Sequence, residues 1–79
     1  MWEVHYSLEA STYLEDNGSL ISNLFFAMES LADSAGIPTT RSFDEMQGLY
    51  YWLVEDHLIV YRRIETQKIA RIIFIKPDF

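Results

Sequence analysis

The stretch that decides the fold is GLYYWLVEDHLIVYRRIETQKIARIIFIK, which runs from residue 48 to residue 76. Its apolar runs are rich in aromatic and β-branched side chains, which favour extended strands. Polar residues at 55–56 and 65–67 separate these runs and supply turn signals. We therefore predict an antiparallel three-stranded meander over residues 49–54, 57–64 and 68–76, ended by Pro77.

The sequence before this meander begins with a strand and a helix. Residues 2–6 alternate apolar and polar side chains, as a half-buried strand does. Ser7 is a candidate N-cap for a helix over residues 8–16, with Leu8 expected among its inward-facing side chains. We expect Gly18 to end this helix in the left-handed conformation, which glycine adopts without steric cost.

A second, longer helix is expected to follow. Ser19 is the predicted N-cap of this helix. The apolar side chains of the helix recur at spacings of one, three and four as far as Ala35, and together they form one stripe along the helix. Gly36 is expected to end it, and Pro38 prevents a restart. Two helices joined by so short a break should form a hairpin across the sheet. Residues 39–47 are polar, and we expect them to be irregular.

The size and composition indicate one domain over residues 1–79, of the α+β class, in the order β-α-α-β-β-β. Hydrophobic residues make up 49% of the chain and aromatic residues 15%, so a dense core can form without disulfide bonds or a structural metal. There is no cysteine, which excludes disulfides, thiolate metal sites and a cysteine nucleophile. We expect neither a metal nor a cofactor.

Two further properties bear on location and nucleic-acid binding. No stretch approaches the roughly 18 apolar residues of a membrane span, and the N-terminus does not resemble a signal peptide. We therefore expect a cytoplasmic protein without membrane contact. The net charge is −6, and five of the six basic residues lie between Arg62 and Lys76. Because Lys and Arg supply the affinity for phosphate, we expect weak direct nucleic-acid binding at most.

Two runs carry a resemblance to a known family. Val4-His5-Tyr6-Ser7-Leu8-Glu9-Ala10 ends a strand and begins a helical hairpin, while Gly48-Leu49-Tyr50 leads through Glu55-Asp56 to His57-Leu58-Ile59-Val60-Tyr61. In both runs the chain resembles the RelE/ParE superfamily of toxins from type II toxin–antitoxin systems. The resemblance spans nearly all of the chain. It implies the order β-α-α-β-β-β, a cognate antitoxin as partner, and the ribosome or DNA gyrase as target.

The residues that depart from the family pattern bear on activity. Members that cleave mRNA carry Lys or Arg on the second and third strands and a basic-then-aromatic segment after the last strand. Here the corresponding strand positions hold Tyr51, Leu53 and Leu58, and Lys76 is followed by Pro77-Asp78-Phe79. The resemblance therefore implies the non-nuclease branch, known for inhibiting DNA gyrase through protein contacts, or a degenerate toxin.

Both faces of the predicted meander are largely apolar. With a period of two, one face should pack under the helices: Tyr50, Trp52, Val54, Ile59, Tyr61, Ile69, Ile73 and Ile75. An open antiparallel sheet normally has a polar outer face, so a second apolar face predicts a protein-binding surface. The candidate partner-binding residues are Tyr51, Leu53, Leu58, Val60, Arg62, Ile72, Phe74 and Lys76.

Four side chains are candidates for chemistry. Arg62, Arg63 and Lys76 can touch phosphate or a carboxylate-rich partner, and His57, beside two acids, can serve as a general base. The structural alternative is that the arginines solvate a strand and protect it from edge pairing. For His57, the alternative is that it only opens a strand after a turn.

Three functional hypotheses follow. The first is a toxin-like protein of the RelE/ParE fold that acts through protein contacts. The second is a ribosome-dependent mRNA interferase that uses Arg62, Arg63, Arg71 and Lys76 in place of the usual bases. The third is a non-toxic interaction module whose apolar sheet forms a homodimer.

Overall fold

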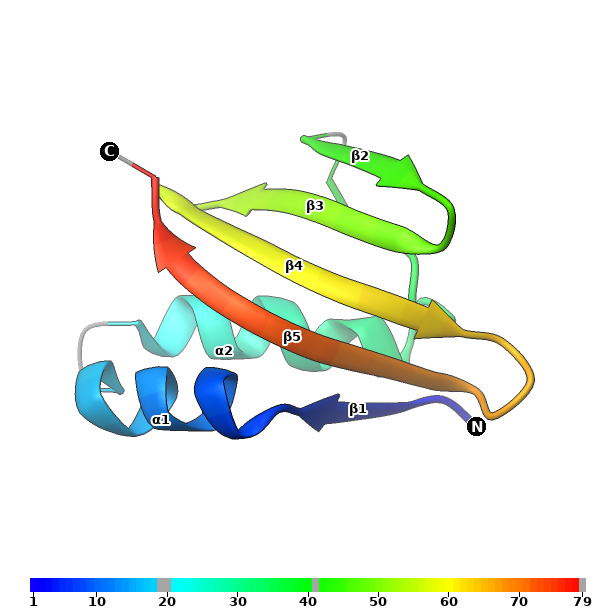
Figure 1. Cartoon of the computed structure of the whole chain (residues 1–79), viewed down its shortest axis with the longest axis horizontal. Helices are drawn as coiled ribbons and strands as arrows, with labels where there is room; N and C mark the ends of the chain where they lie inside the picture. The colour runs from blue at the N-terminus through cyan, green and yellow to red at the C-terminus, as the bar shows by residue number, and fades with distance from the viewer. Residues whose placement is uncertain (19–20, 41, 79) are drawn as a thin grey trace.

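The computed structural model describes residues 1–18, 21–40 and 42–78, and it has the predicted mixture of helices and strands (Figure 1). Two α-helices accompany a five-stranded sheet. In chain order the elements are β1 (Glu3–Tyr6), α1 (Leu8–Asn17), α2 (Ser22–Glu29), the 3-10 helix η1 (Ser30–Ala32), β2 (Phe43–Met46), β3 (Leu49–Val54), β4 (His57–Ile64) and β5 (Ile69–Pro77).

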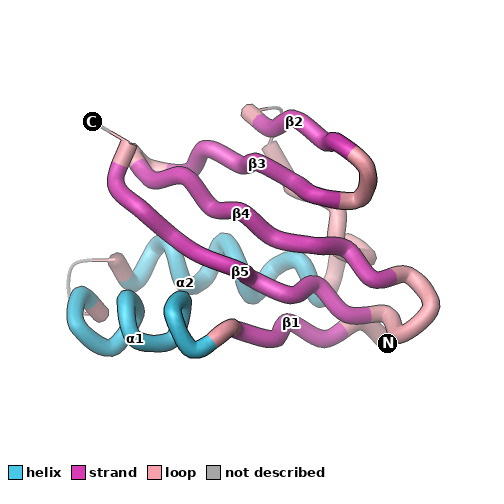
Figure 2. The backbone as a smooth tube through the Cα atoms, in the orientation of Figure 1, coloured by secondary structure: helices cyan, strands magenta, loops and turns pink. Residues whose placement is uncertain are grey.

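The strands lie in the order β1-β5-β4-β3-β2. The predicted meander is present, because β3, β4 and β5 pair antiparallel to one another. The first strand, β1, pairs parallel to β5, with Glu3 beside Ile69 and Tyr6 beside Ile72. Both helices lie on one side of this sheet, and α2 passes behind it in the view of Figure 2. We call the side that the helices cover the inner face and the opposite side the outer face.

The prediction that residues 39–47 are irregular is wrong for Phe43–Met46, which form β2. The reason is the two-residue turn that follows. Gln47 and Gly48 both have positive φ, 54° and 85°, and such turns match the twist of the strands that they join. The turn pairs β2 with β3, so that Met46 lies opposite Leu49 and Phe43 opposite Trp52.

The first helix is confirmed, with two corrections. The Ser7 side chain accepts a hydrogen bond from the Ala10 backbone N–H at 3.1 Å, as an N-cap does. Leu8 does not face the core, however. It is 84% exposed, because it lies on the side of the first turn opposite to the fully buried Ala10. Gly18 is not left-handed either, since its φ of −54° and ψ of −38° continue the helical conformation.

The second helix is shorter than the sequence predicts. It begins at Ser22 without a side-chain cap, and Ser19, the predicted cap, lies outside the described residues. After Glu29 the chain tightens into η1, and the helical segment ends at Ala32, earlier than the predicted end at Gly36. Ala35 and Gly36, with φ of 56° and 75°, form the left-handed part of the turn that follows. The Leu24, Met28 and Leu31 side chains of this segment are fully buried against the sheet.

The centre of the core is an aromatic cluster on the inner face. Trp52 and Tyr61 are fully buried, and Tyr50 stacks on Tyr61 with 4.9 Å between ring centroids. Each buried polar tip has a partner. The Trp52 indole N–H donates to the Thr40 hydroxyl at 2.9 Å, and the Tyr61 hydroxyl donates to the Gly36 carbonyl at 2.7 Å. This last bond joins β4 to the end of the helical segment.

The predicted faces of β5 are wrong over its first half because the strand contains a bulge. Val60 lies opposite Phe74, yet the next residue of β4, Tyr61, lies opposite Ile72, so Ile73 has no partner. An extra residue shifts the alternation of side chains by one position. Ile72 is therefore fully buried on the inner face instead of the outer one, and Ile73 lies outside the buried core.

The same shift changes two more residues of β5. Ala70, which a strict period of two would place on the outer face together with Ile72, is fully buried in the core cluster. Ile69, predicted for the inner face, lies opposite Ile64 of β4 and outside that cluster. Beyond the bulge the prediction is confirmed, since Ile75 is buried opposite the fully buried Ile59.

Candidate functional site

The strand register places the outer-face side chains in rows that cross the sheet. Residues directly opposite each other on neighbouring strands share a face. One row is Leu53, Leu58 and Lys76, and the next is Asp44, Tyr51, Val60 and Phe74. A third row is Met46, Leu49, Arg62, Arg71 and His5, and it crosses all five strands. The outer face thus combines apolar and basic side chains. We call Tyr51, Leu53, Leu58, Val60 and Phe74 the apolar area, and we call the third row, which contains His5, Arg62 and Arg71, the basic row.

The apolar area of the outer face is accessible at its edges and closed at its centre. Tyr51 is 36% exposed and Leu53 47% exposed, while Leu58 and Phe74 are partly buried. Val60 is only 3% exposed although it is not part of the inner core, because its cross-strand neighbours Tyr51 and Phe74 flank it. Val60 therefore forms the floor of this area and offers little surface to a partner.

One residue of the predicted partner-binding set does not lie on the outer face. The strand period predicts Ile72 on the outer face, but the bulge turns it to the inner face, where it is fully buried opposite Tyr61. Six of the eight predicted residues remain on the outer face with some surface available: Tyr51, Leu53, Leu58, Arg62, Phe74 and Lys76.

The basic row contains two arginines that face each other. Arg62 of β4 lies directly opposite Arg71 of β5, and both side chains are exposed. Within the described ranges neither one forms an ion pair, whereas His5, the next side chain in the row, pairs with Glu3 at 2.8 Å. Like charges directly opposite each other across two strands destabilise a sheet. This pair of arginines is the clearest electrostatic feature of the outer face.

Arg63 is not part of this feature, because it lies on the inner face. Its Nε donates to the Ala35 carbonyl at 2.7 Å, and Nη1 contacts a Glu65 carboxylate oxygen at 3.1 Å. Its guanidinium lies 4.6 Å from the centre of the Trp2 ring, which adds a cation–π contact. These contacts give Arg63 a structural role at the end of the helical segment.

His57 is also held by structural contacts. Its Nδ1 lies 3.0 Å from the Glu55 carbonyl oxygen, and its Nε2 lies 2.8 Å from the Tyr13 hydroxyl. A carbonyl only accepts, so Nδ1 carries the proton of this bond, and in the tautomer with its proton on Nδ1 the Nε2 atom accepts from the Tyr13 hydroxyl. The two rings also meet edge to face, with 5.8 Å between centroids. His57 therefore ties the start of β4 to α1.

The four candidates for chemistry do not converge on one place. Arg63 and His57 lie on the inner side of the sheet, and Arg62 and Lys76 lie on the outer side. Lys76 is opposite Leu58, four residues along β4 from Arg62, which is about 13 Å at the rise of a strand. In the part of the chain that the structure describes, no three His, Asp or Glu side chains are placed to hold a metal ion.

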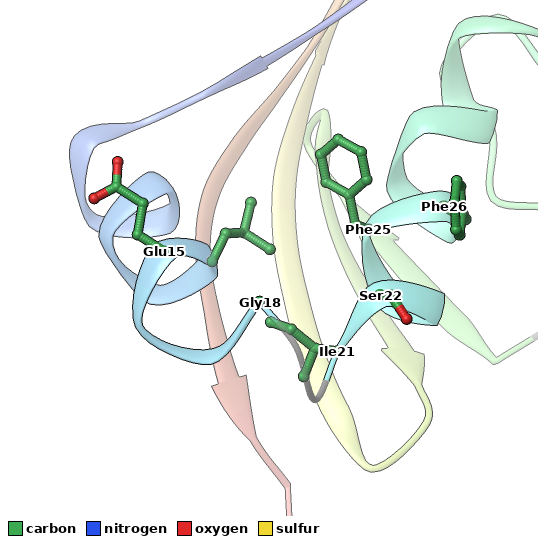
Figure 3. Close-up of a pocket in the computed structure, with 7 residues that line it drawn as sticks. Glu15, Gly18, Ile21, Ser22, Phe25 and Phe26 are labelled. Atoms are coloured by element: carbon green, nitrogen blue, oxygen red, sulfur yellow. The ribbon is translucent and has the colours of Figure 1, made fainter.

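A separate apolar concavity lies between the end of α1 and the start of α2 (Figure 3). It has a volume of about 320 Å³, and Leu14, Ile21, Phe25 and Phe26 supply its apolar lining. Phe26 is 68% exposed.

Tyr6 contacts α2 beside this concavity. Its ring stacks on Phe25, and its hydroxyl donates to Glu29. Burial, reinforced by this carboxylate, raises the pKa of the Tyr6 hydroxyl.

The basic row is a feature that the sequence reasoning misses. In the sequence Arg71 is only one of several bases, and His5 appears only within the first strand. No local signal reveals that β1 pairs parallel to β5, which brings His5 beside Arg71. The opposition of Arg62 and Arg71 follows from the turn between β4 and β5, and a strict register count across residues 65–68 could have found it.

When the chain is compared with family models, with curated proteins and with solved structures, none of them matches it. Among the helices of the described residues, none has both the length and the apolar character that crossing a membrane requires.

Proposed function

We propose that the chain is a toxin-like component of a type II toxin–antitoxin system, of the RelE/ParE fold, that acts in the cytoplasm by binding another protein. The observation that carries this proposal is the outer face of the sheet. Neither helix covers it, and the apolar side chains of Tyr51, Leu53 and Phe74 lie there around the buried Val60. Exposed apolar areas rimmed by polar residues are typical of protein–protein contact sites.

The order of elements also supports the proposal. A strand, two helices and an antiparallel meander follow one another as the family resemblance implies, and β2 is an addition to that order. The positions at which nuclease members carry basic residues hold Tyr51, Leu53 and Leu58. These three side chains form part of the apolar area, so the residues that depart from the nuclease pattern belong to the proposed contact surface.

The proposal is tested by induced expression in bacterial cells. Growth should arrest while ribosome-bound message stays intact, and co-expression of an antitoxin-like protein encoded next to the chain should relieve the arrest. Leu53→Gln should weaken both effects, because Leu53 lies on the outer face. Leu8→Gln is the matched control, since Leu8 is a more exposed leucine on α1. Harmless induction, together with no binding to the neighbouring protein, would overturn the proposal.

The same experiment separates the two alternatives. An mRNA interferase would produce cleaved message, and it would need Arg62, Arg63, Arg71 and Lys76 to act together. The inner-face contacts of Arg63 oppose that arrangement. A homodimeric module would be harmless on induction and would elute in size exclusion at twice 9.3 kDa.

A further inference from the structure

We infer that the outer face binds a protein segment that carries a carboxylate beside apolar side chains, and that Arg62 and Arg71 together hold this carboxylate. The inference rests on the proposed protein-binding function and adds to it the chemistry of the partner. The apolar area of Tyr51, Leu53 and Phe74 would supply most of the contact, and the two arginines would select an acidic segment over a neutral one.

The first argument is the unbalanced charge of the arginine pair. Arg62 and Arg71 lie opposite each other on the same face, and within residues 1–18, 21–40 and 42–78 neither has an acidic partner. This arrangement costs stability in the free protein. In the free protein the Arg62 guanidinium leans toward the β2–β3 turn, with Nη1 3.8 Å from where a Cβ at Gly48 would be, and therefore away from β5. Joint binding of one carboxylate thus requires the flexible Arg62 side chain to turn toward Arg71. An anion bound between the two arginines would remove the repulsion and accept hydrogen bonds from both.

The second argument is the position of the pair relative to the apolar area. The row that holds the arginines lies directly beside the row of Tyr51, Val60 and Phe74, on the same three strands. A segment that covers Tyr51 and Phe74 therefore places its next side chains over Arg62 and Arg71. Arg is suited to this contact because its planar guanidinium binds a carboxylate through two parallel hydrogen bonds.

A second copy of the chain is a poorer occupant. Placed face to face, it would bring Arg62, Arg71 and Lys76 to both sides of one interface. The carboxylates on the outer face are few among the described residues, and that of Glu3 is already paired with His5. Like charges placed against each other across an interface suppress association.

RNA is also a poorer occupant. The chain carries a net charge of −6, and Asp44 lies directly opposite Tyr51 on the outer face. A carboxylate at that place repels a phosphodiester backbone that would run across the aromatic side chains. Two or three arginine and lysine contacts supply little of the counterion release on which nucleic-acid affinity depends.

The test uses two synthetic amphipathic peptides with the same leucine pattern. One carries glutamate and the other carries glutamine beside the leucine stripe. Binding to the isotopically labelled chain is followed by changes in backbone amide shifts. The glutamate peptide should shift the outer-face amides and should bind about fivefold more tightly than the glutamine peptide, the scale of an exposed ion pair. Arg62→Gln or Arg71→Gln should reduce its affinity to that of the glutamine peptide.

The matched control is Lys68→Gln, which removes one positive charge at the exposed β4–β5 turn. It should leave the ratio of the affinities for the glutamate and glutamine peptides unchanged. Equal binding of the two peptides at the outer face would overturn the inference and leave the proposed protein-binding function in place. If neither peptide shifts the outer-face amides, both the inference and the proposed protein-binding function are contradicted.

A single-stranded RNA oligonucleotide is the third ligand. Tighter binding of the RNA at Arg62 and Arg71 would also overturn the inference, because the face would then be a nucleic-acid site.

Discussion

Arg62 and Arg63 are neighbours in the chain, yet their side chains lie on opposite faces of the sheet and have different surroundings. Arg62 is exposed opposite Arg71, without an acidic partner among the described residues. Arg63 donates to the Ala35 carbonyl and covers the Trp2 ring. This pair sets an arginine held by structural contacts beside one that we propose for binding, and it provides a matched comparison.

Replacement of each arginine by methionine should give unequal losses of stability. Arg63→Met removes a charge-assisted hydrogen bond and a cation–π contact, so we expect the free energy of unfolding to fall by about 2 kcal/mol. Arg62→Met should change it by less than about 0.5 kcal/mol, as is usual for an exposed side chain. Urea unfolding followed by tryptophan fluorescence measures both. Equal losses would contradict the assignment of the two side chains to opposite faces.

The stability of the chain should fall at alkaline pH, in part through Tyr61. Burial raises the pKa of the Tyr61 hydroxyl, and Tyr50 beside it acts in the same direction. In the unfolded chain the pKa is about 10. Above that pH the unfolded state loses the proton while the folded state keeps it, so stability falls as the pH rises. Below a pH of about 10 this contribution is fully present.

Tyr61→Phe should reveal this linkage. At neutral pH the variant should be less stable by about 1–3 kcal/mol, because the buried Gly36 carbonyl loses its donor. Its melting temperature should, however, fall less steeply than that of the parent chain as the pH rises past about 10. Tyr51→Phe, which removes an exposed hydroxyl on the outer face, is the control. If the melting temperatures of the parent and the Tyr61 variant fall equally steeply as the pH rises past about 10, the linkage is contradicted.

Two glycines with positive φ should respond differently to alanine. Gly48 has a φ of 85°, and a Cβ added there would find its nearest atom 3.8 Å away, on the flexible Arg62 side chain. Gly48→Ala should therefore cost about 1 kcal/mol, the backbone penalty alone. At Gly36 a Cβ would also lie 3.1 Å from the Trp2 ring and 3.2 Å from Arg63. Gly36→Ala should cost more, and thermal unfolding of the two variants compares them.

The contact between α1 and β4 should be measurable as a coupling energy. A double-mutant cycle of Tyr13→Phe and His57→Ala should give a coupling of about 1 kcal/mol, the usual net contribution of one hydrogen bond. This value follows from the 2.8 Å contact between the Tyr13 hydroxyl and His57 Nε2. Additive losses would show that the two side chains do not interact in solution.

Local signals in the sequence are sufficient to predict several features of the fold. The Ser7 cap and the Glu55-Asp56 turn are decided by the chemistry of a few adjacent residues, and the structure has both. The opposite orientations of Arg62 and Arg63 also follow from the period of a strand. Such features need no knowledge of distant parts of the chain.

Features that depend on distant pairing could not be predicted. The bulge at Ile73 appears only in the pairing of β5 with β4, and it reverses the expected orientation of Ile72. The parallel contact of β1 with β5 leaves no trace in either segment alone. The strand β2 escapes prediction for a different reason, since Gln47-Gly48 is a weaker turn signal than Asn-Gly or Asp-Gly.

The place of β5 between β1 and β4 also determines the order in which the protein can assemble during its synthesis. Glu3–Tyr6 leave the ribosome before the other four strands, but their hydrogen-bonding partners at residues 69–72 belong to the strand that is made last of the five. Until then β1 has no neighbour, and the buried side chains of α1 and α2 lack part of the surface on which they pack. Contacts so distant in sequence slow folding. The nascent chain should therefore remain unfolded and sensitive to proteases until β5 emerges, and the outer face of the sheet should form in a single late step.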